Sequence, residues 1–202
     1  MGPAIQIAVA AAEPTDEQLV SRLGAGDIGA LGQLFVRHKL LVGHALRRFA
    51  PAAAAAEIEE LVQDVFLALP KAAARYEERT RFKAWLFGIA VRTARHCNRR
   101  AWVRRERSLR VETGEASPLA PAPDQAAALR EEALLLLGSL PPGQREVLVL
   151  HAVEGFDGEE IARILGISPG TVWTRLHRAR QAVLAAQEAA VPIRGAELEV
   201  ER

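Results

Sequence analysis

LPPGQREVLVLHAVEGFDGEEIARILGISPGTVWTRLHRARQAVLA, the stretch from Leu140 to Ala185, predicts a helical module that ends in a helix-turn-helix. Asp157 can cap a first helix, and Glu160, three residues later, can return a hydrogen bond to the N–H of the capping residue. Ser168 can cap a second helix, with Pro169 at its first position, where a missing N–H costs nothing. The two caps therefore define where both helices begin.

Apolar residues repeat at helical spacing in both predicted helices, and Gly166 lies between them, where a left-handed residue ends the first helix. In the second helix the residues expected to face inward are Val172, Leu176, Ala179 and Val183. Those expected to face outward are Thr171, Trp173, Thr174, Arg175, His177, Arg178 and Arg180. Small polar residues followed by arginines suit the DNA major groove, so we predict a DNA-binding end. The alternative is a helical hairpin with a solvated basic face.

Charge is distributed unevenly along the chain, although the formal net charge is only +1. Residues 71–110 hold thirteen Lys or Arg against three Glu, a balance of +10. Residues 111–160 hold two Arg against ten Asp or Glu, a balance of −8. Blocks of opposite sign predict one surface that faces a polyanion and another that avoids it.

Composition argues against secretion, a membrane span and enzymatic chemistry. Cys97 is the single cysteine, which excludes an internal disulfide and favours a reducing, cytoplasmic location. The apolar stretch Ile5 to Ala12 is short and follows no basic residue, so neither a signal peptide nor membrane insertion is expected. The five histidines fall mostly on separate predicted helices, and His96 and Cys97 are adjacent and point apart. We therefore expect no catalytic residues, no metal site and no cofactor.

The chain divides into two small helical domains, which predicts an all-α fold joined by a flexible linker. Thr15 with Gln18 forms a capping box for a short helix, and Asp27 can cap a longer one. A stretch rich in Pro, Ala, Gly and Ser separates the two halves. The predicted boundaries are a loose N-terminal tail 1–14, a helical domain 15–108, a linker 109–124, a helix-turn-helix domain 125–187 and a C-terminal tail 188–202.

The third predicted helix of the first domain carries a compact acidic face. Its inward residues are Ile58, Leu61, Val62, Val65, Phe66 and Leu69, and its acidic side holds Glu57, Glu59, Glu60, Gln63 and Asp64. This face is either an ordinary solvated surface that complements the helix dipole or a docking surface. Residues 70–80 are expected to interrupt the helix.

A long basic helix is predicted from about Arg81 to Arg107. Its packed side is Phe82, Trp85, Leu86, Ile89, Ala90 and Thr93, and arginines cover the remainder. Arginines interleaved with aromatic rings suit single-stranded nucleic acid, because cations neutralise the backbone while rings stack on bases. Phe82 and Trp85 are expected in the core, whereas Tyr76 and Trp102 could serve either purpose.

These residues resemble the extracytoplasmic-function group of the sigma-70 family, from about Leu19 to Ala185. AEIEELVQDVFLAL (residues 56–69) and RFKAWLFGIAVRTARHCNRR (residues 81–100) resemble the second conserved region of that group. The stretch from Leu140 to Arg180 resembles the fourth region. The order of the two motifs makes the resemblance specific.

The resemblance implies a subunit of RNA polymerase that supplies promoter preference, with core RNA polymerase and promoter DNA as partners and an anti-sigma factor as antagonist. By this analogy Glu59, Glu60, Gln63 and Asp64 dock on the clamp helices of the largest polymerase subunit. The residues expected to read the melted minus-ten element are Tyr76, Arg79, Thr80, Arg81, Arg92, Arg95, His96, Arg99 and Arg100. Those expected to read the minus-thirty-five duplex are Ser168, Thr171, Trp173, Thr174, Arg175, His177 and Arg178.

The sequence departs from the family pattern at positions that contact DNA. Arg92 stands where the family often carries Asn, and His96 stands where it often carries Asp or Asn. These two departures put the minus-ten sequence preference in doubt. Trp173 stands where Lys or Arg is usual, and Thr174 where Ser is usual. Because a tryptophan cannot make a bidentate guanine contact, we predict that Trp173 packs on sugar or on a thymine methyl and that its polar neighbours read the bases.

Two other classes of protein remain possible. A stand-alone helix-turn-helix regulator would use the same recognition helix without polymerase, but it would need a receiver or ligand-binding first domain, of which the sequence carries no sign. A mimic that sequesters an antagonist would not need a DNA-competent recognition helix.

Overall fold

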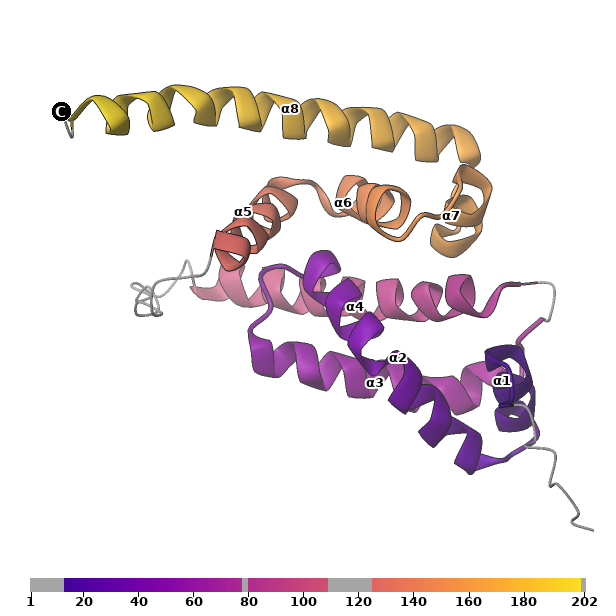
Figure 1. The fold of residues 1–202 in the computed structure, drawn as a ribbon. Coiled ribbons are helices and arrows are strands. Elements are labelled where there is room, and N and C mark those ends of the chain that lie inside the picture. The colour runs from indigo at the N-terminus through magenta and orange to yellow at the C-terminus, as the bar shows by residue number, and fades with distance from the viewer. Residues whose placement is uncertain (1–12, 78–79, 109–124, 201–202) are drawn as a thin grey trace, which may run out of the picture.

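The computed structural model of the chain describes residues 13–77, 80–108 and 125–200, and these form helices arranged in two stacked units (Figure 1). The first unit contains α1 to α4, and the second contains α5 to α8 with a short π-helical turn, η1, after α6. The predicted linker 109–124 lies outside the described residues. The helices are α1 (Asp16–Gly24), α2 (Ile28–Phe49), α3 (Ala55–Ala73), α4 (Phe82–Ser108), α5 (Gln125–Ser139), α6 (Pro142–Leu148), η1 (Val149–Val153), α7 (Gly158–Leu165) and α8 (Pro169–Val200).

The helix starts of the first unit follow the predicted caps. The side chain of Thr15 accepts a bond from the backbone N–H of Gln18, which returns one to the backbone of Thr15. Asp27 caps α2 by accepting from the N–H of Gly29, and it also pairs with Arg22 at 2.6 Å. The hydrogen bond from Arg22 lowers the pKa of Asp27, which keeps the cap ionised.

Helix α3 continues past Pro70, so the predicted break at this residue is wrong. A proline inside a helix removes one backbone hydrogen bond, yet here only the last turn lies beyond it. That turn carries the buried residue Ala73, and the carbonyl of Ala73 lies close to Gly24 of α1. Packing against α1 therefore holds the last turn in place.

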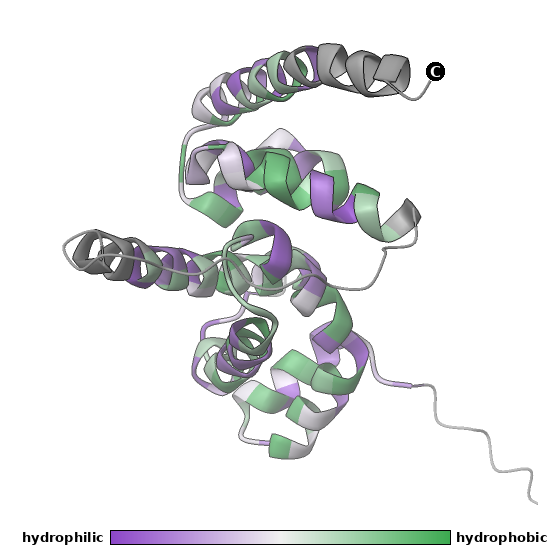
Figure 2. Cartoon of the chain, turned by 90° about the vertical axis from the view of Figure 1, so that its left-hand side faces the viewer, coloured by the Kyte–Doolittle hydropathy of each residue, from purple (hydrophilic) through white to green (hydrophobic). Residues whose placement is uncertain are grey.

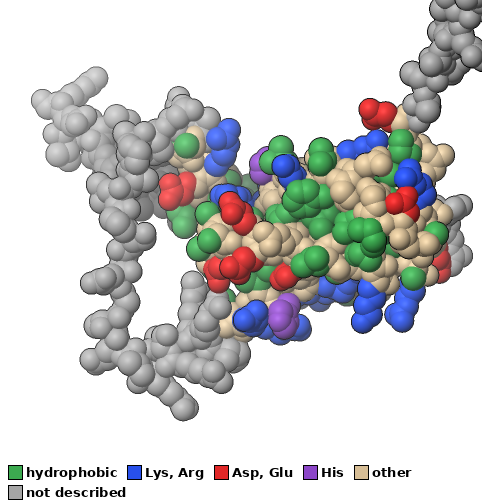
Figure 3. All heavy atoms as spheres, turned by 90° about the horizontal axis from the view of Figure 1, so that it is seen from below, with side chains coloured by type: hydrophobic (Ala, Val, Ile, Leu, Met, Phe, Trp, Pro, Cys, Tyr) green, Lys and Arg blue, Asp and Glu red, His purple; other side chains and the backbone are tan. Residues whose placement is uncertain are grey.

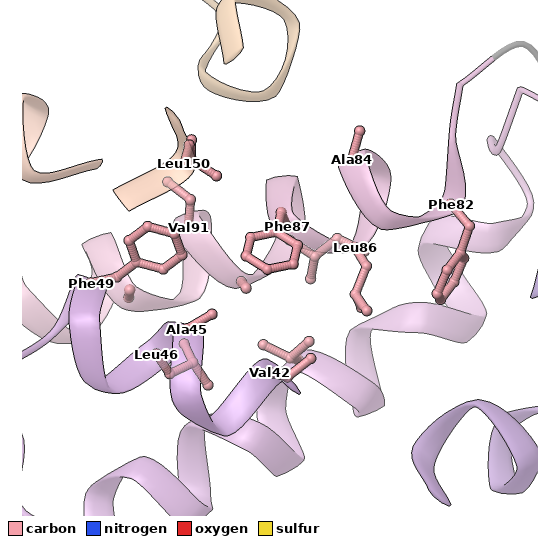
Figure 4. Packing of buried hydrophobic residues seen from close by; sticks show 14 of the residues in the cluster. Val42, Ala45, Leu46, Phe49, Phe82, Ala84, Leu86, Phe87, Val91 and Leu150 are labelled. Carbon is pink, nitrogen blue, oxygen red and sulfur yellow. The ribbon is translucent and has the colours of Figure 1, made fainter. Parts of the chain in front are cut away.

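The core of the first unit forms where α2, α3 and α4 meet. Helix α4 buries Phe82, Leu86, Phe87 and Val91, while α2 contributes Phe49 and its apolar neighbours (Figure 4). Trp85 is partly buried against the same core, as predicted. Figure 2 shows hydrophobic and hydrophilic residues mixed along the helices, as amphipathic packing requires.

The second unit contains the predicted helix-turn-helix. Asp157 and Glu160 form the capping box of α7, and Gly166 ends that helix at φ 66° in the left-handed region. Ser168 accepts from the N–H of Thr171 and so caps α8. Within α8 the predicted inward residues Val172, Leu176 and Ala179 are buried.

Two features of the second unit differ from the prediction. Helix α8 runs on to Val200, through most of the predicted C-terminal tail. The turn η1 adds a residue to the helical repeat, with the N–H of Glu154 bonding the carbonyl of Val149 at 3.1 Å. This shift buries the consecutive residues Val149 and Leu150 and leaves Leu148 only partly buried.

Buried apolar residues of both units belong to one continuous cluster. Phe87 of α4 lies edge-on to Phe49 of α2 and to Phe156 of the second unit, at ring distances of 6.4 and 5.4 Å. Leu150 approaches Val91 and Phe49 from above (Figure 4). The two units therefore pack directly against each other. Within the described residues, no helix combines the length and hydropathy needed to cross a bilayer.

Candidate nucleic-acid and partner interfaces

The acidic face of α3 points to solvent. Glu59, Glu60, Gln63 and Asp64 are exposed, while Ile58 and the other predicted inward residues of this helix are buried or partly buried. Exposed apolar side chains accompany the acidic residues on this side of the unit. Figure 3 looks at the molecule from below and shows hydrophobic side chains among charged ones on that face. The most exposed large apolar side chains of α2 and α3 are Ile28, Val36, Leu40 and Leu67.

An open groove runs between α3 and α4, and both acidic and basic side chains line it. Glu60 and Asp64 line the α3 wall, whereas Arg92, His96 and Arg100 line the α4 wall. The structure thus brings predicted polymerase contacts and predicted minus-ten contacts to the same groove. Their proximity allows one partner to touch both helices.

The connection between α3 and α4 is held by an aromatic pair. The hydroxyl of Tyr76 donates to the carbonyl of Thr80 at 2.5 Å, and its ring lies edge-on to Trp85 at 5.2 Å. Tyr76 is half-buried, so this residue supports the connection while part of its side chain stays exposed to solvent. Arg79, another predicted minus-ten residue, lies outside the described residues.

Two predicted minus-ten residues bind carboxylates of the second unit. Arg95 donates two hydrogen bonds to Glu146, with Nε–Oε1 and Nη2–Oε2 distances of 2.7 and 2.6 Å. These bonds raise the pKa of Arg95. Arg81, whose side chain is exposed, reaches Glu160 at 3.0 Å.

The predicted minus-ten residues do not share a single surface. Arg92, His96 and Arg100 line the groove toward α3, whereas Arg95 and Arg99 line a cleft toward α6. Arg175, a predicted minus-thirty-five residue, lines that same cleft and packs over Gly143. The cleft therefore collects guanidinium groups from both predicted DNA surfaces.

Most of the residues predicted to read the minus-thirty-five element are exposed to solvent. Trp173, Thr174, His177 and Arg178 are exposed. The hydroxyl of Thr174 donates to the carbonyl of Gly170 at 2.9 Å, which fixes its rotamer and leaves the oxygen free to accept. The hydroxyls of Ser168 and Thr171 are 2.8 Å apart and are engaged in capping the helix.

Trp173 is half exposed, and packing fixes its other face. Its ring lies edge-on to His151 at 5.8 Å and covers Gly158, the first residue of α7. A Cβ added at Gly158 would come within 2.9 Å of the ring, so only glycine allows this contact. The indole is thus a rigid part of the surface near the start of the recognition helix.

Sequence reasoning missed the carboxylates that join the two units. Glu146, Glu154 and Glu160 all carry nearly buried side chains. Glu154 pairs with Arg48 at 3.3 Å and with Lys83 at 3.4 Å. The only signal in the sequence was the pair of oppositely charged blocks, which indicates complementary surfaces without naming partners.

The described residues contain no group of three or more His, Cys, Asp and Glu side chains that could hold a metal ion. His38 is the histidine engaged most closely by an acid, with its Nε2 2.9 Å from Asp16, and it packs against Phe82. This pair lies within the helix packing of the first unit.

Comparison with known proteins matches both halves of the chain. Residues 34–106 match a family model described as Sigma-70 region 2, and residues 130–183 match one described as Sigma-70, region 4. The chain is 40% identical over 158 residues to RNA polymerase sigma factor CarQ of Myxococcus xanthus, covering 78% of this chain and 87% of that protein. It is 32% identical over 184 residues to the ECF RNA polymerase sigma-E factor of Escherichia coli (strain K12), covering 84% of this chain and 92% of that protein.

Solved structures agree with these matches. The structure of CnrH in complex with the cytosolic domain of CnrY is similar with a TM-score of 0.63 and 30% identity, covering 86% of this chain and 97% of that one. The sigma factor RpoE in complex with the anti-sigma factor NepR from Bartonella quintana is similar with a TM-score of 0.57 and 29% identity, covering 76% and 96%.

Proposed function

Because this chain belongs to the extracytoplasmic-function (ECF) group of the sigma-70 family, we propose that it binds core RNA polymerase, recognises the minus-ten and minus-thirty-five elements and promotes DNA opening. The observation that carries this proposal is the presence of regions 2 and 4, in this order, on one chain. The sigma-70 family is not a class of enzymes, so the reaction belongs to the polymerase.

The acidic face of α3 is the proposed docking surface for core polymerase. Glu59, Glu60, Gln63 and Asp64 are exposed on one side of a helix whose opposite side is buried. Leu67, 72% exposed, lies beside them and adds apolar surface. Stable protein interfaces combine an apolar centre with polar residues that fix orientation, and this face offers both.

The connection before α4 and the basic side of this helix form the proposed minus-ten surface. Unstacking and holding a base costs a few kcal/mol, which cations and aromatic rings can recover. Tyr76 offers a ring, and Arg92, His96 and Arg100 offer exposed polar or cationic groups along one side of α4. Arg95 and Arg99 extend the surface toward the second unit.

The helix-turn-helix is the proposed reader of the minus-thirty-five duplex. The residues assigned to this role are Ser168, Thr171, Trp173, Thr174, Arg175, His177 and Arg178. A helix-turn-helix reads intact duplex and cannot hold a melted strand. Two recognition surfaces on one chain each contribute modest affinity, and the polymerase fixes the distance between them.

An anti-sigma factor is the proposed antagonist, and the cytoplasm is the proposed location, because the polymerase and the promoter are found there. Support for the antagonist comes from CnrH and RpoE, whose structures hold CnrY and the anti-sigma factor NepR. The alternative of a stand-alone regulator has weaker support, because the first unit matches region 2.

Run-off transcription with purified core polymerase tests the proposed function. We expect transcripts that start at one defined site on a template carrying a cognate promoter, and none from core polymerase alone. A stand-alone regulator would bind the duplex without starting transcripts. Absence of a defined start on every promoter of the chain's own genome would contradict the proposal.

Replacing Trp173 by lysine is expected to change the minus-thirty-five preference. The indole cannot donate to two acceptors of guanine, whereas a lysine can contact guanine, and a good base contact discriminates by about 1–3 kcal/mol. The measurement is selection of bound duplexes from a pool randomised in this element. Trp173→Phe, which keeps a ring over Gly158, is the matched control and should retain the original preference. An unchanged preference in Trp173→Lys would show that this residue does not contribute to reading.

A further inference from the structure

The indole of Trp173 packs on two segments that precede the recognition helix in the chain. His151 of η1 lies edge-on to it, with 5.8 Å between the ring centroids and 77° between the ring planes. Gly158, the first residue of α7, lies against the ring and has no Cβ to displace it. The side chain is nevertheless half exposed to solvent. Three segments of the second unit therefore meet at one partly exposed indole.

His151, the central residue of η1, is itself held in one orientation. Its Nδ1 lies 3.2 Å from the carbonyl oxygen of Phe156, and because a carbonyl can only accept, this nitrogen donates. Phe156 is buried and packs edge-on to Phe87 of α4, which anchors the acceptor in the core. Val149 and Leu150, which precede the histidine in η1, are fully buried. The core thus fixes the imidazole, and the imidazole contacts the indole.

The orientation of the indole leaves carbon atoms available to a partner. The ring atoms nearest to Gly158 are Cζ2, Cε2 and Nε1, and the closest of them lies 2.9 Å from the position of an added Cβ. The edge that carries the ring N–H therefore lies on the protein side. The remaining ring atoms are all carbon, so the exposed part of Trp173 is suited to an apolar contact.

The position of Trp173 on α8 indicates which apolar group it meets. Residues near the N-terminus of a recognition helix contact base edges in the major groove, and Trp173 follows the start of α8 at Pro169 by four residues. The apolar group that base pairs present in this groove is the C5 methyl of thymine. A contact with deoxyribose would carry no sequence information, so the two alternatives are distinguishable by experiment.

We propose that His151 is a positioning residue that holds the indole of Trp173 in place to read a thymine methyl in the minus-thirty-five duplex. The proposal rests on the proposed function, because it takes α8 as the reader of this duplex. A side chain that is ordered before binding loses less conformational freedom in the complex, so its contact contributes more affinity. An indole without the imidazole beside it gains rotamer freedom and discriminates less between bases.

Two substitutions of His151 separate the role of the ring from the role of the hydrogen bond. His151→Phe keeps a ring beside Trp173 and removes the donor to Phe156. His151→Asn keeps an N–H donor on a short side chain and removes the ring. The matched control is Val153→Ala, because Val153 also belongs to η1 and is exposed. Thermal unfolding checks that each variant is folded.

Deoxyuridine tests the methyl contact directly, because it pairs as thymidine does and lacks only the C5 methyl. Each thymidine of the minus-thirty-five element that the unaltered chain selects is replaced in turn, and binding is measured for the chain with core polymerase. At one position the replacement should weaken binding about fourfold, the effect of one buried methyl group at about 0.8 kcal/mol. His151→Phe and Val153→Ala should retain this discrimination, whereas His151→Asn should bind both duplexes equally.

A second readout does not depend on DNA. 5-Fluorotryptophan incorporated into the free chain gives a fluorine resonance for position 173, which is identified by its loss in Trp173→Phe. The shift of this resonance between H₂O and D₂O reports how much of the indole is exposed to solvent. This solvent shift should increase in His151→Asn and stay close to that of the unaltered chain in His151→Phe and Val153→Ala.

Equal affinity of the unaltered chain for every thymidine and deoxyuridine duplex would overturn the methyl contact. Retained discrimination in His151→Asn, or its loss in Val153→Ala, would overturn the positioning role of His151. Run-off transcription on the unmodified promoter separates these outcomes from failure of the proposed function. Normal run-off with equal affinities removes only the role of His151 and Trp173 in reading. Absence of run-off removes the proposed function, and the fluorine resonance then decides whether His151 holds the indole.

Discussion

Replacing Glu60 and Asp64 together by lysine is expected to abolish binding to core RNA polymerase while the chain remains folded. Both side chains are exposed on α3, and the residues that hold this helix in the core, such as Leu61 and Val65, lie on its other side. Reversing two charges at a complementary interface replaces attraction by repulsion, so we expect at least about a hundredfold loss of affinity, or about 2.7 kcal/mol. Run-off transcription should be lost in parallel.

The control for this experiment reverses charge elsewhere. Glu159→Lys with Glu188→Lys changes the net charge by the same amount on the second unit, and it should leave core binding within about twofold of the unaltered chain. A neutral pair, Glu60→Gln with Asp64→Asn, should fall between the two. Affinity is measured by native electrophoresis or pull-down with purified core, and folding by circular dichroism. Core binding that survives the reversal would place the docking surface elsewhere on the chain.

Local signals in the sequence predicted the helix boundaries well. The capping boxes at Thr15 and Asp157 and the left-handed Gly166 each involve residues only a few positions apart, so the sequence holds all the partners. Amphipathic spacing likewise predicted the buried sides of α3 and α8. Such features depend on backbone geometry that is the same in every helix.

Features that depend on tertiary packing were not predicted. The last turn of α3 survives Pro70 because Ala73 packs near Gly24, almost fifty residues away in the chain. The shift at η1 accompanies the burial of both Val149 and Leu150 in the cluster that spans the two units. No short stretch of sequence contains this information.

The candidate sites show the same limit. Residues assigned by resemblance lie on exposed helix faces, but their neighbours across space came only from the structure. The sequence gives no reason to pair Arg95 with Glu146, fifty-one positions later, rather than with another acid of the same block. No pattern in the sequence predicted the burial of Arg145, adjacent to Glu146, although it is one of the most buried charged residues described.

Replacing Arg145 by methionine is expected to be among the most destabilising single changes in the chain. This guanidinium is 7% exposed and donates to backbone carbonyls of both units. One bond reaches Phe49 at the end of α2, at 3.1 Å. The other bonds reach Leu137, Gly138 and Leu140, at the end of α5 and just after it, at 2.6, 3.3 and 2.9 Å. Arg145 thus joins α2, α5 and α6.

Burial lowers the pKa of Arg145, which the nearby Glu146 partly offsets, but an arginine remains charged at any pH where the protein is folded. Methionine fills similar volume and donates nothing, so four carbonyls lose a hydrogen bond. The carbonyl of Phe49 keeps its bond from Asn98, and that of Leu137 keeps its bond from the N–H of Leu140. Carbonyls at a helix C-terminus have no partner within the helix, and leaving buried ones unsatisfied is costly. We expect the free energy of unfolding to fall by about 3–5 kcal/mol and Tm by about 10 °C.

The same substitution at Arg130 separates this effect from a general loss of charge. Arg130 lies on α5 and is exposed, so Arg130→Met should change the free energy of unfolding by less than about 0.5 kcal/mol. Arg145→Lys should be intermediate, because an ammonium cannot reach all four carbonyls at once. Unfolding is followed in urea by circular dichroism. Equal urea midpoints for Arg145→Met and Arg130→Met would mean that water replaces the guanidinium at little cost. The contact between α2, α5 and α6 would then depend on apolar packing, such as that of Phe87 against Phe49 and Phe156.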